Sequence, residues 1–298
     1  MNKKVIAVYL DDSQPMEIEL SWLYKTWILH GLDEVFDIVV YHHPKAESWL
    51  KKIKDRPQVI TIEMKPLATA EKYKFLNSRN IFLDPYNQPL QQYEYVLATD
   101  CDCFLTQHIK NIEPQKMYVG QGGYCAVGDV DHLGAMSKLC NHFSFEHQGL
   151  HNIGSSYFGK MDEIMRLAKM QVEFTEFLLS PSGEEIFWAD YKKSHKGVSS
   201  MLGGEMSVNY FYREEDLVLN ALDAECNNNK MDESVIHIHA WHTIPFWSKH
   251  QFFQKSYAAL RINFIDAFSS TGSYCHWIAT TPIEEIKRYR DLLLQLGK

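Results

Sequence analysis

Short apolar runs alternate with helical patterns along the first third of the chain. Residues 4–10 (KVIAVYL) and 36–41 (FDIVVY) are almost wholly apolar, as is typical of strands buried on both faces of a sheet. Between them, residues 17–30 place leucine and tryptophan side chains at helical spacing, and Gly31 is positioned to end this helix. The pattern predicts a strand-helix-strand unit at the amino-terminal end.

The same alternation continues as far as residue 98. Residues 58–62 (QVITI) and 95–98 (YVLA) are predicted strands, with a predicted helix over residues 68–80 between them. Strands that alternate with helices form a mostly parallel sheet with helices on both faces. We therefore expect a single-domain α/β fold of Rossmann-like type, with a mixed, mostly parallel sheet.

The second half of the chain has a less regular pattern. Residues 118–128 are glycine-rich, and residues 152–159 (NIGSSYFG) predict a polar turn that runs into a strand. Residues 235–239 (VIHIH) alternate apolar side chains with histidine, which predicts a half-buried strand with both imidazoles on one face. Helices are predicted over residues 162–169, 205–212 and 282–296.

Composition and charge narrow the class of protein. The 298 residues are 45% hydrophobic and 23% charged, which is ordinary for a globular protein with a sizeable core. The formal net charge of -8 and the dispersed basic residues give no general attraction to nucleic acid. We place a catalytic domain over residues 1–250, divided into halves 1–110 and 111–250, with a helical extension over residues 251–298 packed on it.

The chain shows no targeting or membrane signal. The apolar run over residues 5–10 is too short for a signal peptide, and no stretch approaches the roughly 18 apolar residues of a membrane span. We therefore expect a soluble, cytoplasmic protein. The six cysteines lack paired zinc spacing and are expected to be thiols in a reducing compartment. Cys101 and Cys103 alone cannot complete a tetrahedral site, which disfavours a metal-thiolate interpretation.

Two acidic pairs follow predicted strands. Asp11 and Asp12 come after the first strand, and Asp100 and Asp102 come after the fourth. In a parallel sheet both pairs lie at the same edge, where ligands of such sheets bind. Two carboxylates at a strand end suit a divalent cation whose expected partner is a phosphate. The alternatives are a turn with solvated carboxylates and, for the first pair, an Asx turn or helix cap.

Three histidines, His237, His239 and His242, fall within six residues. One such histidine would usually be a hydrogen-bonded core residue, but three beside an aromatic turn favour a metal-ligand cluster. Carboxylates combined with one imidazole suit Mn²⁺ better than Mg²⁺ or Zn²⁺. Which of the three binds metal stays open, and a zinc hydrolase is an alternative.

The order of these motifs resembles the glycosyltransferase-A fold, and most closely the retaining family that includes glycogenin and bacterial lipopolysaccharide galactosyltransferases. That family carries the motifs DxD, NxG, DQxxxN and HxxGxxKPW in this order. The corresponding segments here are residues 100–102, 152–154, 204–209 and 239–249, and the resemblance covers about residues 3–250. A fainter resemblance is to glycosyltransferases of large algal viruses, which implies a virus-encoded protein that acts in the host cytoplasm.

Two positions depart from the family motifs. Gly204 and Glu205 stand where the family has Asp-Gln, and Lys249 follows the Pro-Phe-Trp segment instead of preceding a Pro-Trp pair. The resemblance implies transfer of a sugar from a nucleotide sugar, most simply a UDP-sugar, to a glycan or other hydroxyl acceptor. The resemblance favours transfer with retention of configuration.

The resemblance also implies roles for particular residues. A bound Mn²⁺ or Mg²⁺ on Asp100, Asp102 and His239 would stabilise the charge of the leaving diphosphate. The residues implied in nucleotide-sugar binding are Asp11, Asp12, Lys72, Arg79, Asp100, Asn152, Gly154, Ser155 and Lys249. Lys72 is otherwise an ordinary solvated charge on a helix.

The resemblance places Glu205 across the sugar from the leaving group. There it would act as a nucleophile, stabilise a positive centre or serve as a base, with Asp190 as the reserve carboxylate. The alternative for Glu205 is a first-turn residue that complements the helix dipole. The residues implied in acceptor binding are Trp188, Trp241, His242 and Trp247, and core packing is the alternative for the aromatic ones.

Three other functions compete with glycosyl transfer. A haloacid-dehalogenase-type phosphatase also ends an apolar strand in DxD, but it has Thr or Val where this chain has Phe104. A metal-dependent hydrolase would act without a nucleotide. A non-catalytic sugar-binding module would not respond to UDP.

Overall fold

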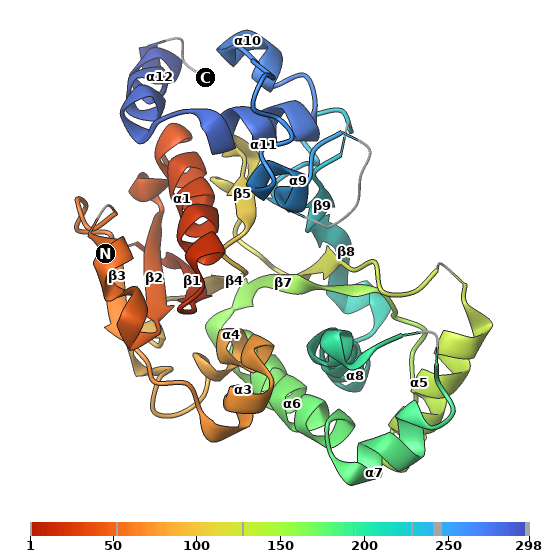
Figure 1. The fold of residues 1–298 in the computed structure, drawn as a ribbon. Coiled ribbons are helices and arrows are strands. Elements are labelled where there is room, and N and C mark those ends of the chain that lie inside the picture. Colours follow the sequence, from red (N-terminus) through yellow and green to blue (C-terminus); the bar gives the residue numbers. More distant parts are fainter. Residues whose placement is uncertain are drawn as a thin grey trace. The chain divides into compact units, whose positions relative to one another are not determined.

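The computed structural model describes residues 2–51, 53–126, 128–192, 194–227, 229–240 and 246–295. It confirms a mixed α/β fold in which helices cover parallel strands (Figure 1). The chain divides into two compact units. The first comprises Met1–Glu63, Asp100–Glu113 and Ala221–Lys298, and the second comprises Met64–Thr99 and Pro114–Asn220. The domain boundaries proposed at residues 110 and 250 stay predictions.

The first unit contains three parallel strands in the order β3-β2-β1. They are β1 (Lys4–Leu10), β2 (Phe36–His42) and β3 (Val59–Glu63). Every residue of β1 and β2 is buried, which explains their nearly continuous apolar sequence. Leu10 pairs with His42, so the carboxyl ends of these two strands lie at one edge.

Helix α1 (Gln14–Leu29) joins β1 to β2 and lies against these strands (Figure 1). It ends where the sequence predicts, because Gly31 adopts a left-handed φ of 60°. The helix also packs against α11 (Thr271–Thr280) and α12 (Ile283–Gln295). Most of α1 is therefore buried, including the polar side chain of Glu19.

A separate sheet of three short strands has the order β5-β10-β9. Its strands are β5 (Cys103–Leu105), β10 (His237–His239) and β9 (Ala224–Glu225). Strand β10 runs antiparallel to β5 and parallel to β9. This sheet brings segments that are far apart in the sequence into contact within the first unit.

Aromatic side chains form a core beside this small sheet. Trp22 stacks on Phe104 with ring centroids 5.4 Å apart, and Trp247 meets Trp22 edge-on at 5.5 Å. Phe252 adds a further edge-on contact with Trp22 at 5.4 Å. Such pairs add stability beyond the area that they bury, so they fix α1 against β5 and the segment around residue 247.

The second unit is built from antiparallel strands. Strands β4 (Tyr95–Ala98) and β6 (Met117–Gln121) both pair with β7 (Ile153–Lys160). Helices α6 (Met161–Leu178) and α8 (Ser199–Phe211) pack on each other and on β7. The other helices and strands are α2 (Glu47–Leu50), α3 (Ala68–Lys72), α4 (Asn77–Asn80), α5 (Val130–His142), α7 (Pro181–Gly183), β8 (Leu217–Leu222), α9 (Lys249–Phe253) and α10 (Phe264–Ala267).

Two predicted helices differ from the structure. The predicted helix over residues 68–80 is interrupted by a 3-10 turn over Lys74–Leu76. Helix α8 begins at Ser199, upstream of the predicted start at residue 205, so Gly203 and Gly204 lie inside it. These glycines permit close packing, because a Cβ atom at Gly203 would lie 2.8 Å from the Gln171 carbonyl oxygen of α6.

None of the described helices is long and apolar enough to cross a membrane. The six cysteines, all of which lie in the described part of the chain, form no disulfide.

Replacing Trp247 with alanine should lower the free energy of unfolding by about 3–5 kcal/mol, because the substitution empties a fully buried site in the aromatic core. Urea denaturation measures the change. Ile265→Ala is the control, since Ile265 is 85% exposed in the same unit and should change stability by less than about 0.5 kcal/mol. A Trp247 variant as stable as the parent protein would contradict this packing.

Candidate functional site

Asp102 and His239 meet where β5 pairs with β10. Asp102 directly precedes β5, and the antiparallel register places His239 opposite Cys103. The backbone N–H of Ala240 donates to the Asp102 carbonyl oxygen at 2.9 Å and extends this pairing. Strand pairing thus brings the acidic motif and the histidine segment together.

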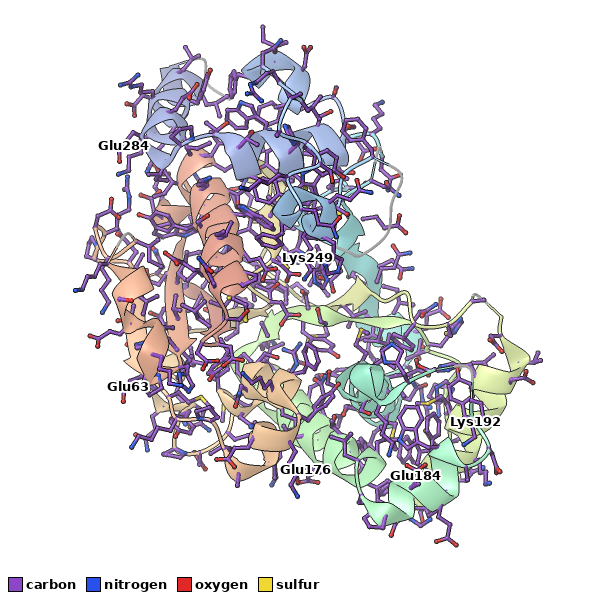
Figure 2. The ribbon with its side chains drawn as sticks, viewed as in Figure 1. Glu63, Glu176, Glu184, Lys192, Lys249 and Glu284 are labelled. Atoms are coloured by element: carbon purple, nitrogen blue, oxygen red, sulfur yellow. The ribbon has the colours of Figure 1, made fainter. Side chains whose placement is uncertain are left out.

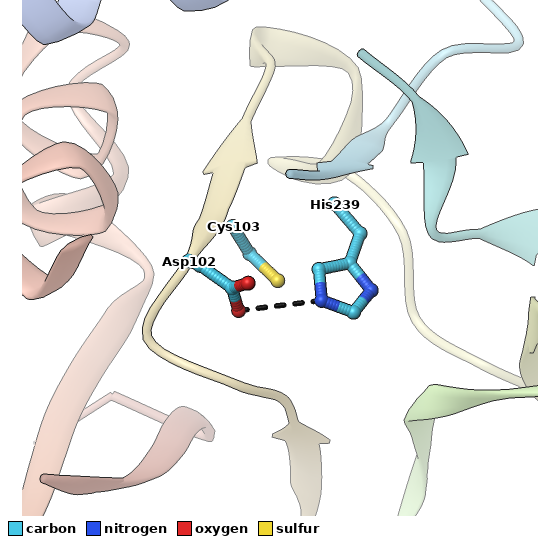
Figure 3. A group of neighbouring side chains, drawn as sticks. All are labelled: Asp102, Cys103 and His239. Carbon is cyan, nitrogen blue, oxygen red and sulfur yellow. Dashed lines mark ion pairs between the residues drawn. The ribbon is translucent and has the colours of Figure 1, made fainter. Parts of the chain in front are cut away.

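The two side chains form an ion pair. His239 Nε2 lies 3.3 Å from Asp102 Oδ1, and Figure 3 shows Cys103 beside them. One ligand atom from each of the three side chains lies within 4.8 Å of those of the other two. His239 is 20% exposed and Asp102 is 7% exposed, so solvent reaches the pair from the histidine side.

Lys249 and Glu19 complete the charged cluster in the first unit. Lys249, the first residue of α9 (Figure 2), pairs with Asp102 Oδ2. Its Nζ also lies 3.7 Å from Oε1 of Glu19, which projects from α1. Asp102 is therefore held between two basic groups, with one at each carboxylate oxygen.

These charges shift the pKa values of the cluster. Burial alone raises the pKa of Asp102, but Lys249 and His239 outweigh it and hold that pKa well below its usual value. Burial alone lowers the pKa of His239, but Asp102 outweighs it and raises that pKa to about 9. Burial, together with the charge of Asp102, raises the pKa of Glu19 to about 7. At neutral pH the cluster therefore contains an ionised Asp102 and a protonated His239.

The structure brings the two predicted acidic pairs to one strand end. Cys101 Sγ donates to the Tyr9 carbonyl oxygen at 3.3 Å, which places the 100–102 segment beside the end of β1. Asp11 follows that strand and is buried. Asp12 is partly exposed and lies 3.7 Å from Lys45 Nζ.

Asp100 is close enough to act electrostatically on Glu19, His239 and Lys249. However, it is not in either group of described residues whose ligand atoms gather within 4.8 Å. Of the two motif carboxylates, Asp102 is the one that the structure places against the histidine.

Sequence reasoning missed three members of this region: Glu19, Cys103 and Asp223. Glu19 is a polar residue in the buried part of a helix, which was a detectable signal. Cys103 was set aside because two cysteines cannot complete a metal site, although the histidines that approach it were already noted. Asp223 gave no signal, since its position depends on how β9 pairs with β10.

In the second unit, Glu205 lies in the middle of α8 and is completely buried. Its Oε1 accepts hydrogen bonds from His132 Nε2 at 2.9 Å and His147 Nε2 at 3.1 Å. Its Oε2 accepts from the Tyr124 hydroxyl and from the Asn152 backbone N–H, the latter at 3.1 Å. Both carboxylate oxygens are therefore engaged.

Burial alone raises the pKa of Glu205, but the hydrogen bonds from His132 and His147 outweigh it and lower that pKa. Burial and the charge of Glu205 raise the pKa of Tyr124 well above its usual value. The expected alternative, a first-turn residue that complements the helix dipole, is wrong because α8 begins at Ser199. Glu205 instead anchors the segments that surround it.

Two motif asparagines hold loops next to Glu205. Asn152 has a left-handed φ of 56°, and its side chain exchanges two hydrogen bonds with the backbone of Cys125. Asn209 Oδ1 accepts from the backbone N–H of Gln148 at 2.7 Å, and its Nδ2 donates to the Leu150 carbonyl oxygen at 2.6 Å. These hydrogen bonds give Asn152 and Asn209 a structural role, because each side chain holds the backbone of a neighbouring loop.

Arg79 and Ser155 come together in the second unit. An Arg79 terminal nitrogen donates to the Ser155 carbonyl oxygen, and the guanidinium lies over the Tyr157 ring at 5.4 Å. Arg79 Nη1, Ser155 Oγ and the side-chain amides of Asn77 and Asn80 are buried without a hydrogen-bond partner. Buried polar groups normally have partners, so these atoms are an unusual feature of the second unit.

Three other residues that were predicted to bind the nucleotide sugar or to act in catalysis also lie in the second unit. Gly154 is buried within β7, and Lys72 is exposed at the end of α3. Asp190 is 68% exposed and pairs with Lys138 at the surface, and its role as the reserve carboxylate stays a prediction.

The predicted acceptor platform is not formed by its described tryptophans. Trp188 is buried and donates through Nε1 to the Leu178 carbonyl oxygen at 2.8 Å. Trp247 is fully buried in the aromatic core of the first unit. Core packing, the alternative considered above, describes both side chains. Trp241 and His242 lie outside the described residues.

Residues 2–276 match the domain of unknown function DUF7164, and the chain belongs to this family. The match covers Asp102 and His239 in the first unit and Glu205 in the second. No curated protein matches the chain. The family description names no activity, so a functional proposal depends on the site itself.

Glu205→Ala should lower the free energy of unfolding by about 3–5 kcal/mol, because it leaves the donors on His132, His147 and Tyr124 buried without their acceptor. Urea denaturation measures this, with Glu173→Ala on the exposed face of α6 as the control. Equal stability of the two variants would show that the Glu205 contacts contribute little.

Proposed function

We propose that the protein is a metal-dependent glycosyltransferase that moves a sugar from a UDP-sugar to a glycan or another hydroxyl acceptor. The observation that carries the proposal is the meeting of Asp102, His239 and Lys249, which come from three separate segments of the first unit. The cytoplasmic location, the retention of configuration and the identity of the donor sugar stay predictions from the sequence.

The chemistry of these three groups suits a metal-bound diphosphate. A carboxylate and an imidazole are ligands that Mn²⁺ accepts. Asp100 acts electrostatically on His239 but is not among the gathered ligand atoms. When bound, a divalent cation supplies positive charge to the diphosphate that leaves the sugar. In the proposal Asp102 and His239 hold this cation, for which His239 must release its proton.

Lys249 has a second part in the proposal. Its ammonium neutralises Asp102 Oδ2, an oxygen that a cation would otherwise occupy. A cation on Asp102 would release this ammonium to the phosphate oxygens, where a flexible lysine is an effective point charge. Lys249 therefore balances the Asp102 charge in the absence of ligand and contributes to donor binding in its presence.

The roles of Arg79 and Ser155 in nucleotide-sugar binding stay predictions from the sequence. Glu205 is assigned to holding the Asn152 loop, because both its oxygens already accept hydrogen bonds. It is therefore a positioning residue in this proposal and not the attacking group.

A screen of nucleotide sugars with Mn²⁺ tests the proposal directly. Slow hydrolysis of one UDP-sugar is expected, and saturating UDP with Mn²⁺ should stabilise the protein by about 2.7 kcal/mol at one hundred times the dissociation constant. Asp102→Asn should remove both effects, whereas Asp291→Asn on the exposed face of α12 should keep them.

Hydrolysis by Asp102→Asn at the parent rate would contradict the assignment. Binding of sugar without any response to UDP would favour a sugar-binding module. Metal-dependent hydrolysis of substrates that lack a nucleotide would favour a hydrolase.

Lys249→Met should separate metal binding from diphosphate binding. Removal of the ammonium frees Asp102 Oδ2, so Mn²⁺ affinity measured by calorimetry should stay the same or rise. UDP affinity in the presence of Mn²⁺ should fall at least tenfold, since one charged hydrogen bond contributes about 1.5–3 kcal/mol. Lys287→Met is the control, because Lys287 is a partly exposed lysine of the same unit that pairs with Asp55. A parallel loss of both affinities would instead assign Lys249 to holding the site together.

A further inference from the structure

A second group of potential metal ligands lies deeper in the first unit. Cys103, Asp223 and His237 are each completely buried. One ligand atom from each lies within 4.8 Å of those of the other two. The Asp102 and His239 pair is partly exposed to solvent, so the two sets differ in their access to water.

The small sheet determines the position of all three side chains. Cys103 begins β5, His237 begins β10, and Asp223 directly precedes β9. Asp223 is a non-glycine residue with a left-handed φ of 59°. Such a backbone conformation costs free energy and persists where the surroundings impose it, and here it turns the carboxylate towards His237.

The distance between the carboxylate and the imidazole fits a tetrahedral ion. Asp223 Oδ1 lies 3.4 Å from His237 Nδ1, and two ligands at 2.0–2.1 Å from a tetrahedral zinc ion lie about 3.3–3.4 Å apart. His237 Nδ1 accepts a hydrogen bond from the Asp223 N–H at 3.1 Å, which shows that its lone pair faces this segment. A bound ion would accept that lone pair in place of the N–H group.

The chemical nature of the three ligand atoms also indicates which metal ion they prefer. A thiolate with an imidazole and a carboxylate suits Zn²⁺, whereas Mg²⁺ and Mn²⁺ prefer oxygen ligands. Complete burial favours a structural site over a catalytic one, since substrates do not reach it.

We propose that Cys103, Asp223 and His237 bind one structural zinc ion that ties β5, β10 and β9 together. On binding, the Cys103 thiol releases its proton to solvent and becomes a thiolate, and His237 stays neutral. This site goes beyond the proposed glycosyl transfer and does not depend on it. It would stabilise the strand pairing that positions His239.

Refolding with cobalt tests the site, because Co²⁺ occupies zinc sites and a bound thiolate gives a near-ultraviolet charge-transfer band. Protein unfolded with a chelator should refold with one thiolate-bound Co²⁺ per chain, show that band, and lose it when Zn²⁺ is added. The spectrum should be that of a tetrahedral site. Absence of the band, with no zinc retained after refolding in Zn²⁺, would overturn the proposal.

Matched variants identify the sulfur. Cys103→Ala should lose the thiolate band, whereas Cys101→Ala, a buried cysteine two positions away whose thiol donates to Tyr9, should keep it. A band that persists in Cys103→Ala, or is lost only in Cys101→Ala, would overturn the assignment. If Cys103→Ala does not refold, Asp223→Asn decides, and unchanged zinc affinity in that variant would overturn the site.

Asp102→Asn separates this proposal from the proposed function. That variant should keep the zinc ion and the thiolate band while it loses Mn²⁺-dependent hydrolysis of the donor. Loss of the band in Asp102→Asn would assign the sulfur to the Asp102 and His239 pair instead. A protein that binds zinc but hydrolyses no nucleotide sugar would refute the proposed function and leave the zinc site intact.

Discussion

The burial of the Asp102 carboxylate between Lys249 and His239 is the interaction on which the site of the first unit depends. A carboxylate removed from water needs compensating charge or hydrogen bonds. Here the compensation comes from α9 and from β10, both distant along the chain. The antiparallel pairing of β5 with β10 is therefore as much a part of the site as the side chains that it positions.

In the second unit, the buried carboxylate of Glu205 is compensated by a different kind of partner. Glu205 is completely buried, and its oxygens accept hydrogen bonds from imidazole, phenol and backbone groups. Such a network fixes the carboxylate in place. Asp102, in contrast, is paired with a flexible ammonium and a partly exposed imidazole, both of which a metal ion and a phosphate could displace. The two buried carboxylates are thus suited to different tasks, exchange of partners at Asp102 and rigid support at Glu205.

The buried strands could be predicted from the sequence because such strands need continuous apolar runs. The predicted strands over residues 4–10 and 95–98 have the observed bounds. The start of α8 was missed because Gly203 and Gly204 usually mark a helix boundary. In the structure they lie inside α8, where the absence of side chains permits contact with α6. Tertiary packing outweighed local propensity at this point.

The sequence by itself determined the strand positions over residues 4–10 and 95–98, the strand end at which the acidic motif lies, and the candidate ligands in residues 235–239. Tertiary structure alone decided that Asp102 faces His239, that Glu205 is enclosed by donors, and that Cys103 lies near side chains that could hold a metal ion. The physical reason is that strand character depends on neighbouring residues. The protonation and partners of a buried charge depend on strand register and on side chains that come from distant parts of the chain.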